Sequence, residues 1–282
     1  MAELLKGAPV AKAITAQLTQ QVEALKEKGV IPTLSIVRVG ERPDDISYEK
    51  GAMKRCDMCG IAVKNHILPA DATEEELLSV IEGINQDPSI HGVLLFRPLP
   101  KHINENRVCD ALAPEKDMDG ITDGSMAGIF SGSGTGYPPC TAQACIEILD
   151  HYGIEITGKK ATVLGRSNVI GKPVAMLLLQ RNATVTVCHT RTKDLTGTCA
   201  AAEILIAAAG KAGVVSADHV SEGQIVLDVG INVTEEGNLV GDVDFAAVEP
   251  VVSAITPVPA GVGSVTTAVL AKHVVTAAEK TL

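Results

Sequence analysis

The sequence is poor in aromatic residues and has no long hydrophobic run. Its 282 residues include no Trp, three Phe and three Tyr, although 46% of the chain is hydrophobic. Leu, Ile, Val and Ala must therefore build the core, and the length leaves room for two modest domains. No stretch reaches the roughly 18 uncharged apolar residues of a membrane helix, and no signal-like segment opens the chain. We expect a cytoplasmic protein without a membrane partner.

The chain also lacks an excess of basic residues. Lys and Arg number 24 against 34 Asp and Glu, which gives a net charge of -10. Because nucleic acids require a basic surface, the composition argues against them as partners. Any anionic ligand has to be met by a local group of basic side chains.

The cysteines show no pattern of paired metal ligands. There are seven, an odd number that is typical of free thiols in a reducing compartment. Cys56 and Cys59 form a C-x-x-C pair, but no second pair stands at zinc spacing. Both thiols fall within a helical pattern, so we interpret them as helix-packing residues and predict no metal site.

What the chain does contain is an alternation of helix and strand patterns. In the first half, the expected elements after an N-terminal helix are a strand at 33–39, a helix at 44–59, a strand at 62–68, a helix with a capping box at 73–85 and a strand at 92–96. Such alternation predicts a parallel sheet with helices on both faces. A Gly/Ser-rich stretch at 124–136 is expected to be a loop, and a helix at 141–152 to join two domains.

The second half carries a nucleotide-binding pattern. An apolar run at 161–164 stops at Gly165-Arg166-Ser167, a helical segment opens at Gly171, and a second apolar run follows at 184–187. A strand ending in glycine lets the backbone approach a phosphate, and the next helix directs free N–H groups at the anion. The pattern is not a full Gly-x-Gly-x-x-Gly, so a capped strand-to-helix turn is the alternative interpretation.

The segment after the second run, residues 188–193, indicates the coenzyme. NAD-binding folds usually place an acid there for the ribose hydroxyls, and this segment has none. Thr190, Arg191 and Lys193 offer donors that match a 2′-phosphate. The residues favour NADP, and NAD stays open because the same donors also suit inorganic phosphate.

Five segments, including the turn at Gly165, occur in a fixed order along the chain. They are Lys116-Asp117-Met118-Asp119-Gly120, Pro139-Cys140-Thr141, Gly165-Arg166-Ser167 with Gly171-Lys172-Pro173, Gly241-Asp242-Val243-Asp244 and Pro257-Val258-Pro259-Ala260-Gly261-Val262-Gly263. Together they resemble the methylenetetrahydrofolate dehydrogenase/methenyltetrahydrofolate cyclohydrolase family, over essentially the whole chain. The resemblance implies an α/β enzyme, usually a homodimer, with a folate-binding domain (1–140 with 265–282) and a Rossmann-like NADP-binding domain (141–264). The C-terminal helix is expected to return to the first domain.

The resemblance also implies the reaction and the substrate site. Hydride passes from 5,10-methylenetetrahydrofolate to the nicotinamide, giving 5,10-methenyltetrahydrofolate in one-carbon metabolism. Asp119 corresponds to the acid that grips the pterin, and Tyr48 to the residue that lies against the aminobenzoate ring. Pro259 and Gly261 of the C-terminal signature complete the expected substrate site. Without the surrounding motifs, Asp119 and Tyr48 would be interpreted as a turn acid and a core residue.

The same resemblance assigns the cofactor contacts. The expected residues are Gly165, Arg166, Ser167, Thr190 and the backbone of Ile231. Arg166 and Thr190 would read the 2′-phosphate. Arg191 is added from its chemistry, and an exposed surface Arg is its alternative interpretation.

Two positions depart from the bifunctional members of the family. Those members have Lys four residues after the helix Tyr, where this chain has Ala52, and a Gln on a buried strand, where it has Phe96. Lys50 and Lys54 lie about 200° and about 240° around the helix from Tyr48, so neither is a natural substitute. Smaller departures, which bear on loop geometry only, are Ala142, Ala260 and Ser264.

The two departures affect the two reactions differently. Hydride transfer needs no protein base, because the adjacent nitrogen lone pair forms the amidinium as hydride leaves. Hydrolysis of the methenyl product needs placed polar groups to deliver water and manage protons. The sequence therefore predicts a dehydrogenase with weak or absent cyclohydrolase activity. The alternatives are a fully bifunctional enzyme that also makes 10-formyltetrahydrofolate, with Lys54 or water replacing the lysine, a binding protein without turnover, and a shikimate-type dehydrogenase.

Overall fold

The computed structural model describes residues 1–282, which divide into two compact units. The first unit comprises Lys12–Cys140 with Thr267–Leu282, and the second comprises Met1–Ala11 with Thr141–Thr266. The domains expected from the sequence, 1–140 with 265–282 and 141–264, differ from these units mainly in the grouping of residues 1–11. They group with the second unit because β1 (Glu3–Leu4) pairs in parallel with β11 (Ala254–Ile255). A strand of two residues is too short to show a periodic pattern, so this pairing cannot be predicted from the sequence.

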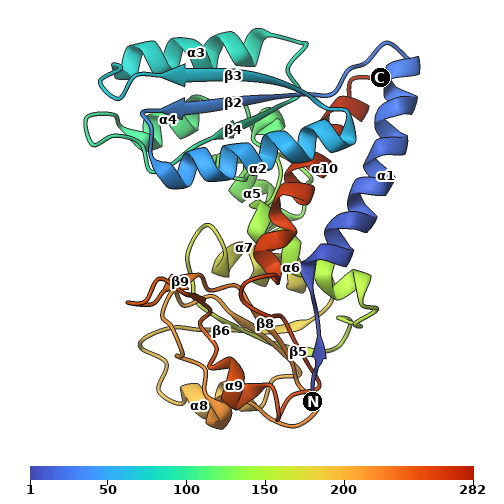
Figure 1. The fold of residues 1–282 in the computed structure, drawn as a ribbon, viewed down its shortest axis with the longest axis vertical. Coiled ribbons are helices and arrows are strands. Elements are labelled where there is room, and N and C mark those ends of the chain that lie inside the picture. Colours follow the sequence, from blue (N-terminus) through green and yellow to red (C-terminus); the bar gives the residue numbers. More distant parts are fainter. The chain divides into compact units, whose positions relative to one another are not determined.

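The first unit is built on a three-stranded parallel sheet (Figure 1). Its strands, in spatial order, are β3 (Ala62–Leu68), β2 (Thr33–Val39) and β4 (Gly92–Leu95). All residues of the central strand β2 are buried, since helices cover both of its faces. The helices of this unit are most of α1 (Gly7–Glu27), α2 (Pro43–Cys59), α3 (Glu74–Gln86), α4 (Glu105–Ala111), α5 (Asp123–Ser131) and α10 (Thr266–Glu279).

Alternate residues of β2 point their side chains to opposite faces of this sheet. Val37 and Val39 join Val93 and Leu95 in one apolar cluster with residues of α3 and α4. This is the two-residue period of a strand, which points successive side chains to opposite faces. Helix α2 lies on the side of the sheet opposite α3 (Figure 1), and its C-terminal end is closed by Gly60 at φ 75°.

The stretch 124–136 corrects one expectation, because α5 occupies its first half. Thr122 caps α5 by accepting the Ser125 N–H at 3.0 Å, and Gly132 ends it at φ 69°. The Gly/Ser-rich composition masked these two end signals, which are the usual ones for a short helix. By contrast, the capping box predicted at Thr73 is present, with the Thr73 N–H donating to Glu76 at 2.8 Å.

The second unit contains a six-stranded, fully parallel sheet in the order β1-β11-β8-β7-β5-β6. Its remaining strands are β5 (Lys160–Leu164), β6 (Thr184–Cys188), β7 (Ile204–Ala207) and β8 (Ile225–Asp228). A separate antiparallel hairpin is formed by β9 (Asn232–Val233) and β10 (Leu239–Val240). The helices of this half of the chain are α6 (Cys140–His151), α7 (Gly171–Gln180), α8 (Leu195–Ala200) and α9 (Phe245–Val248). Strand order reverses at β5, which creates the switch point where ligands bind in such sheets.

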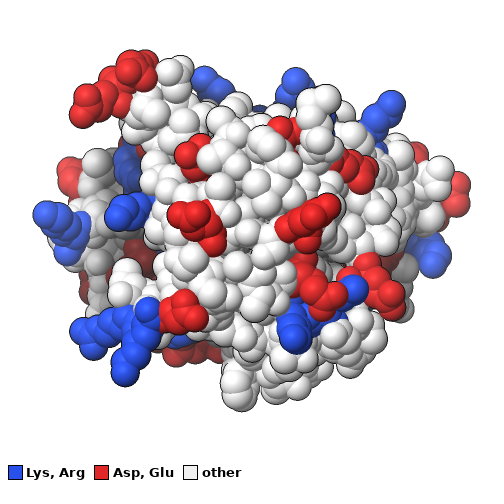
Figure 2. Space-filling view, turned by 90° about the horizontal axis from the view of Figure 1, so that it is seen from below, with Lys and Arg blue, Asp and Glu red and all other residues white.

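The predicted α/β class with parallel sheets is confirmed, and α10 belongs to the first unit as expected. No helix is both long enough and apolar enough to cross a membrane. Figure 2 shows a face of the molecule on which acidic and basic side chains are scattered around a largely uncharged centre. No continuous basic stripe crosses this face, in keeping with the net charge of -10.

Candidate cofactor and substrate site

The carboxyl ends of all six parallel strands meet at one edge of the second unit's sheet. Every residue predicted to contact the cofactor follows a strand at this edge. Gly165, Arg166 and Ser167 follow β5, Thr190 and Arg191 follow β6, and Ile231 follows β8. Pro259 and Gly261 follow β11 at the same edge. This edge is where open α/β sheets bind their ligands.

The turn after β5 is compact because two glycines come close to neighbouring backbone. Gly165 has φ 130°, and a Cβ there would collide with the carbonyl oxygen of Ala208. A Cβ on Gly171 would collide with the carbonyl oxygen of Gly165. The Ser167 hydroxyl accepts the N–H of Ile170 at 3.1 Å and opens α7, whose first turn has no acidic residue. The positive end of the helix dipole is therefore available to an anion.

A tight turn after β6 presents Thr190 and Arg191 to solvent. The His189 N–H donates to the Thr192 hydroxyl at 2.9 Å, and the Arg191 N–H donates to His189 Nδ1 at 3.1 Å. Both side chains at 190 and 191 are exposed.

Basic side chains at this edge have no acidic partners. Arg166, Arg191 and Lys193 are exposed and take part in none of the ion pairs of the structure. In a chain with 34 acidic residues, three unpaired cations at one sheet edge favour an anionic ligand.

Two buried carboxylates, neither of them predicted from the sequence as a site residue, organise the loops at this edge. Asp242 accepts the N–H groups of Ala209, Gly210 and Lys211 at 2.6, 2.8 and 2.9 Å, and the Asn232 amide at 3.0 Å. It thereby ties the loop after β7 to β9. The Gly241-Asp242-Val243-Asp244 motif marks this segment in the sequence, but the residues that donate to Asp242 lie far from it along the chain and meet it only in the folded protein.

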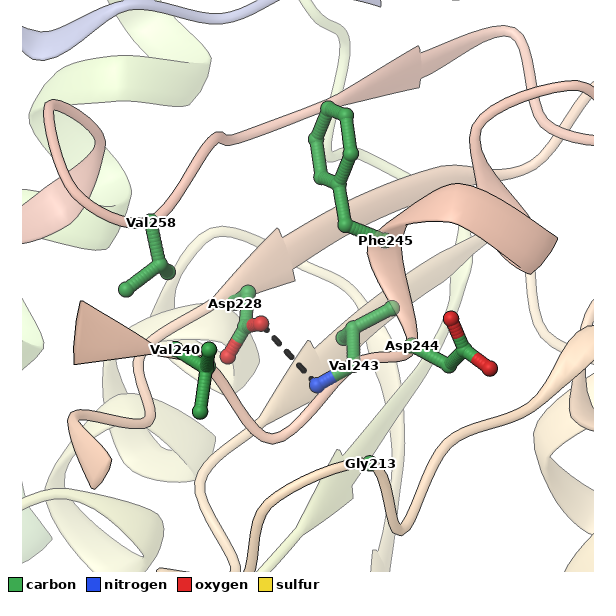
Figure 3. Close-up of a pocket in the computed structure, with 8 residues that line it drawn as sticks. Gly213, Asp228, Val240, Val243, Asp244, Phe245 and Val258 are labelled. Atoms are coloured by element: carbon green, nitrogen blue, oxygen red, sulfur yellow. Dashed lines mark hydrogen bonds between the residues drawn. The ribbon is translucent and has the colours of Figure 1, made fainter. Parts of the chain in front are cut away.

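Asp228, at the end of β8, is the second of these carboxylates. It accepts the N–H groups of Gly230, Asp242 and Val243 at 3.0, 2.9 and 3.0 Å, the last of which is drawn in Figure 3. Burial raises the pKa of Asp228 to about 6, with the charge of Asp242 adding to this effect and the three hydrogen bonds opposing it.

Asp228 borders two hollows at the sheet edge. One, of about 230 Å³, is lined by Ile231, Pro259 and Gly261 among others, so it unites these three predicted residues. The other, of about 280 Å³, is lined by Asp228, Val258 and Phe245 among others (Figure 3). In the first hollow, Ala260 adopts φ 79°, a left-handed conformation that glycine adopts more readily.

In the first unit, the two positions at which this chain differs from the bifunctional members of the family, 52 and 96, carry packed apolar side chains. Ala52 is fully buried and Phe96 is 8% exposed. The rings of Tyr48 and Phe96 meet edge to face, with centroids 6.1 Å apart and planes at 81°. Lys50 and Lys54 are exposed, so neither shares the buried face of α2 with Ala52.

The two acids of the Lys-Asp-Met-Asp-Gly motif have different surroundings. Asp117 is buried and accepts hydrogen bonds from the N–H groups of Ile121 and Thr122 at 3.1 and 2.8 Å and from the Ser125 hydroxyl at 2.7 Å. Asp119 is half-buried and accepts the Cys140 N–H at 2.8 Å, while burial raises the pKa of its carboxyl. Asp117 therefore shapes the turn, and Asp119 is the acid with surface left for a ligand.

Arg38 and Glu49, the residue after Tyr48, form a buried ion pair that was not predicted from the sequence. The signal was an arginine inside the apolar run at 33–39. Tyr48, Asp119, Ala52 and Phe96 belong to the first unit, whereas all predicted cofactor residues, with Pro259 and Gly261, belong to the second.

Family models match both halves of the chain. Residues 5–119 match the catalytic domain of tetrahydrofolate dehydrogenase/cyclohydrolase, and residues 139–282 match its NAD(P)-binding domain. The chain is 53% identical over 275 residues to a protein of Clostridioides difficile named bifunctional protein FolD, which covers 98% of this chain and 96% of the relative.

Solved structures show the same similarity. The bifunctional FolD of Campylobacter jejuni superposes with a TM-score of 0.96 at 39% identity, over the whole of both chains. The FolD of Trypanosoma brucei, solved with NADP cofactor and an inhibitor, superposes with a TM-score of 0.91 at 35% identity, over 99% of this chain and 98% of that one.

These matches confirm the resemblance drawn from the sequence motifs and the prediction that the chain is an enzyme with an NAD(P)-binding domain. They set aside the shikimate-type dehydrogenase and the binding protein without turnover. The chain belongs to the tetrahydrofolate dehydrogenase/cyclohydrolase family.

Proposed function

We propose that this protein oxidises 5,10-methylenetetrahydrofolate to 5,10-methenyltetrahydrofolate with NADP⁺ as hydride acceptor, and that its cyclohydrolase activity is weak or absent. The observation that carries the second part is the buried, apolar packing of Ala52 and Phe96 beside Tyr48. All seven cysteines are free and buried, which suits a reducing compartment such as the cytoplasm.

Residues of the second unit fit the cofactor. The compact Gly165 turn and the N-terminus of α7 suit the pyrophosphate, because backbone N–H groups can approach it closely. Arg166, Thr190 and Arg191 suit the 2′-phosphate, since they are exposed donors and the arginines have no acidic partner. The hollow lined by Ile231, Pro259 and Gly261 suits the nicotinamide end and the folate beside it. When bound, NADP⁺ supplies the hydride acceptor.

Residues of the first unit would hold the folate. Tyr48 offers a half-buried ring for the aminobenzoate group, and Asp119 offers a carboxylate for hydrogen bonds to the pterin. Their task in hydride transfer is to position the methylene carbon, since no proton has to be removed by the protein. We accordingly assign folate binding to Lys12–Cys140 with Thr267–Leu282, and cofactor binding to Met1–Ala11 with Thr141–Thr266.

Hydrolysis of the methenyl product makes greater demands on the protein. Water must be delivered to a cation and protons must be moved on the tetrahedral intermediate, which is work for polar groups. The methyl group of Ala52 and the ring of Phe96 cannot perform it. Arg38 lies nearby and is buried, but its guanidinium is already held by Glu49.

A fully bifunctional enzyme is the second candidate, because relatives of more than half identical sequence are named bifunctional. In that case 10-formyltetrahydrofolate would be a further product. One spectrophotometric assay separates the candidates. Nicotinamide absorbance is followed with NADP⁺ and with NAD⁺, and loss of methenyltetrahydrofolate is then followed without coenzyme. Growth of absorbance with NADP⁺ and a hydrolysis rate at background support the proposal.

We further propose a homodimer. Four large apolar side chains are exposed on or near the β9–β10 hairpin of the second unit: Ile231 at 65%, Val233 at 68%, Leu239 at 45% and Phe245 at 37%. Neighbouring exposed apolar groups of this kind mark protein interfaces. In a symmetric dimer, the same patch of each subunit meets its copy.

A further inference from the structure

A buried ion pair includes Glu49, the residue that follows Tyr48 in α2. Arg38, near the end of β2, is 7% exposed, and Glu49, on α2, is 9% exposed. Arg38 Nε donates to Glu49 Oε2 at 2.7 Å, and Arg38 Nη1 donates to the carbonyl oxygen of Gly40. The pair therefore joins helix α2 to the end of strand β2 through directional hydrogen bonds.

Holding α2 against the sheet does not require these charges. Removing two charges from water costs about as much as their attraction returns, and apolar residues of similar volume often stabilise a fold equally well. The rest of the buried face of α2 illustrates this, because Ala52, Cys56 and Cys59 pack there without charge. What the ion pair adds is geometry, since a guanidinium fixes the direction of its hydrogen bonds.

The ion pair is part of a chain of contacts that links β2, α2 and Phe96 and includes Tyr48 of the proposed folate site. The Phe96 N–H donates to the carbonyl oxygen of Val37 at 3.0 Å, and Arg38 is the next residue along β2. Arg38 holds Glu49, whose neighbour in α2 is Tyr48. The Tyr48 ring returns to Phe96, edge to face at 6.1 Å. Rotation or sliding of α2 relative to β2 would therefore move Tyr48 relative to Phe96.

Two further charged groups lie at this end of α2. Arg42 donates to the carbonyl oxygen of Pro98 at 3.1 Å, which links the start of α2 to the segment after β4. Asp45 is buried one turn before Glu49, with Arg42 3.8 Å away. Each arginine thus faces one buried acid, Arg38 with Glu49 and Arg42 with Asp45.

We propose that Arg38 and Glu49 are positioning residues that set the orientation of Tyr48 for folate binding. This inference rests on the proposed role of Tyr48 as the residue against the aminobenzoate ring. Both side chains are buried, so the pair would act on bound folate only through α2. It should therefore affect binding of folate more than turnover, and should leave coenzyme binding in the second unit unchanged.

Steady-state kinetics of the full chain test this with Glu49→Gln and with the double variant Arg38→Met/Glu49→Met. Both should raise KM for methylenetetrahydrofolate by about threefold to about tenfold, the worth of one aromatic contact. The value of kcat should stay within about twofold, because that contact binds ground state and transition state alike, and the dissociation constant of NADP⁺ should be unchanged. The double variant carries no unpaired buried charge, so it should unfold near the wild-type temperature. If its KM returned to the wild-type value together with its stability, the pair would be merely structural and the proposal would be wrong.

Tyrosine fluorescence gives a second measurement that needs no turnover. The chain has no Trp, and its tyrosines are Tyr48, Tyr137 and Tyr152. A Tyr137→Phe/Tyr152→Phe background leaves Tyr48 as the sole emitter, and the buried Tyr137 hydroxyl has no partner to lose. In this background, Glu49→Gln should at least double the quenching of Tyr48 by acrylamide. Unchanged quenching would contradict the proposal.

Tyr48→Ala separates this inference from the proposed function. If Tyr48→Ala leaves KM for methylenetetrahydrofolate unchanged, the assigned role of Tyr48 is wrong, and the positioning role fails with it. If Tyr48→Ala raises KM but the Arg38 and Glu49 variants do not, only the positioning role is wrong. As a control ion pair, Arg181→Met breaks the exposed contact with Asp150 and should leave KM unchanged.

Discussion

Ala52 and Phe96 decide the chemistry that we propose at the scale of single residues. Both are buried, and Phe96 packs edge to face on Tyr48. Replacing two polar partners together leaves no orphaned donor or acceptor, so the site can be well packed without them. The close packing of Ala52 and Phe96 is what we expect if the Lys and the Gln were replaced together.

The double variant Ala52→Lys/Phe96→Gln should gain cyclohydrolase activity. A placed proton-transfer group contributes about a hundredfold or more, so hydrolysis of methenyltetrahydrofolate should rise by at least about that factor. Lys54→Ala is the matched control, because Lys54 is exposed two residues further along α2. If wild type hydrolysed the methenyl product and Lys54→Ala abolished that activity, the bifunctional alternative would be favoured.

Asp228 should make stability depend on pH. Its pKa, about 6 in the folded protein, lies above its ordinary value of 3.8. The group therefore contributes most stability below about pH 4 and loses that contribution as pH rises through about 6. Asn does not titrate, so Asp228→Asn should be more destabilising at pH 4 than at pH 7, by up to roughly 3 kcal/mol.

Urea unfolding at several pH values measures this difference. Asp244→Asn, which changes an exposed acid of the same segment, is the matched control. A stability difference between wild type and Asp228→Asn that grew from pH 4 to pH 7 would contradict the assigned direction.

Single residues were predictable where their chemistry is local to a motif. The turn at Gly165-Arg166-Ser167 was inferred from the sequence because its strand, turn and helix are consecutive. Asp242 was not, since its partners come from the loop at 209–211 and from Asn232. Arg38 and Glu49 are likewise eleven residues apart and meet only when α2 folds onto β2.

At the scale of elements, the residues that cap helix ends predicted the helices better than amino-acid composition did. The capping box at Thr73 located α3 correctly because both of its hydrogen bonds are encoded within four residues. Glycine and serine content at 124–136 predicted a loop, yet α5 forms where Thr122 and Gly132 close its ends. Strand β1 was unpredictable, since two residues show no period and its partner β11 is far away in the sequence.

The loop after β11 should be strained at Ala260. Its φ of 79° is costly for a residue with a Cβ, at about 1 to 2 kcal/mol. Glycine removes this cost but gains freedom in the unfolded chain, which offsets about half of it. Ala260→Gly should therefore stabilise the protein by about 1 kcal/mol and raise Tm by about 2 to 4 °C.

Differential scanning calorimetry measures that change. The matched control is Ala127→Gly, at an exposed position within α5, which should destabilise by about 1 kcal/mol. Equal effects of the two substitutions, in sign and size, would show that Ala260 is not strained.

At the scale of the whole molecule, the proposed dimer predicts a mass near twice 29.3 kDa. Val233→Glu places a charge on the exposed apolar patch of the β9–β10 hairpin, where Val233 is 68% exposed. It should shift the protein toward monomer without unfolding it, since the side chain is not in the core. Sedimentation velocity reads the mass directly. A wild-type protein that sediments as a monomer at micromolar concentration would contradict the dimer.

The central claim concerns the balance of two activities in one molecule. It is tested most directly by measuring, on one preparation of wild-type protein, the rate of NADP⁺ reduction with methylenetetrahydrofolate and the rate of methenyltetrahydrofolate hydrolysis. The account predicts rapid reduction of NADP⁺ and hydrolysis no faster than in buffer alone. Hydrolysis at a rate comparable to hydride transfer would contradict it and establish the bifunctional enzyme instead.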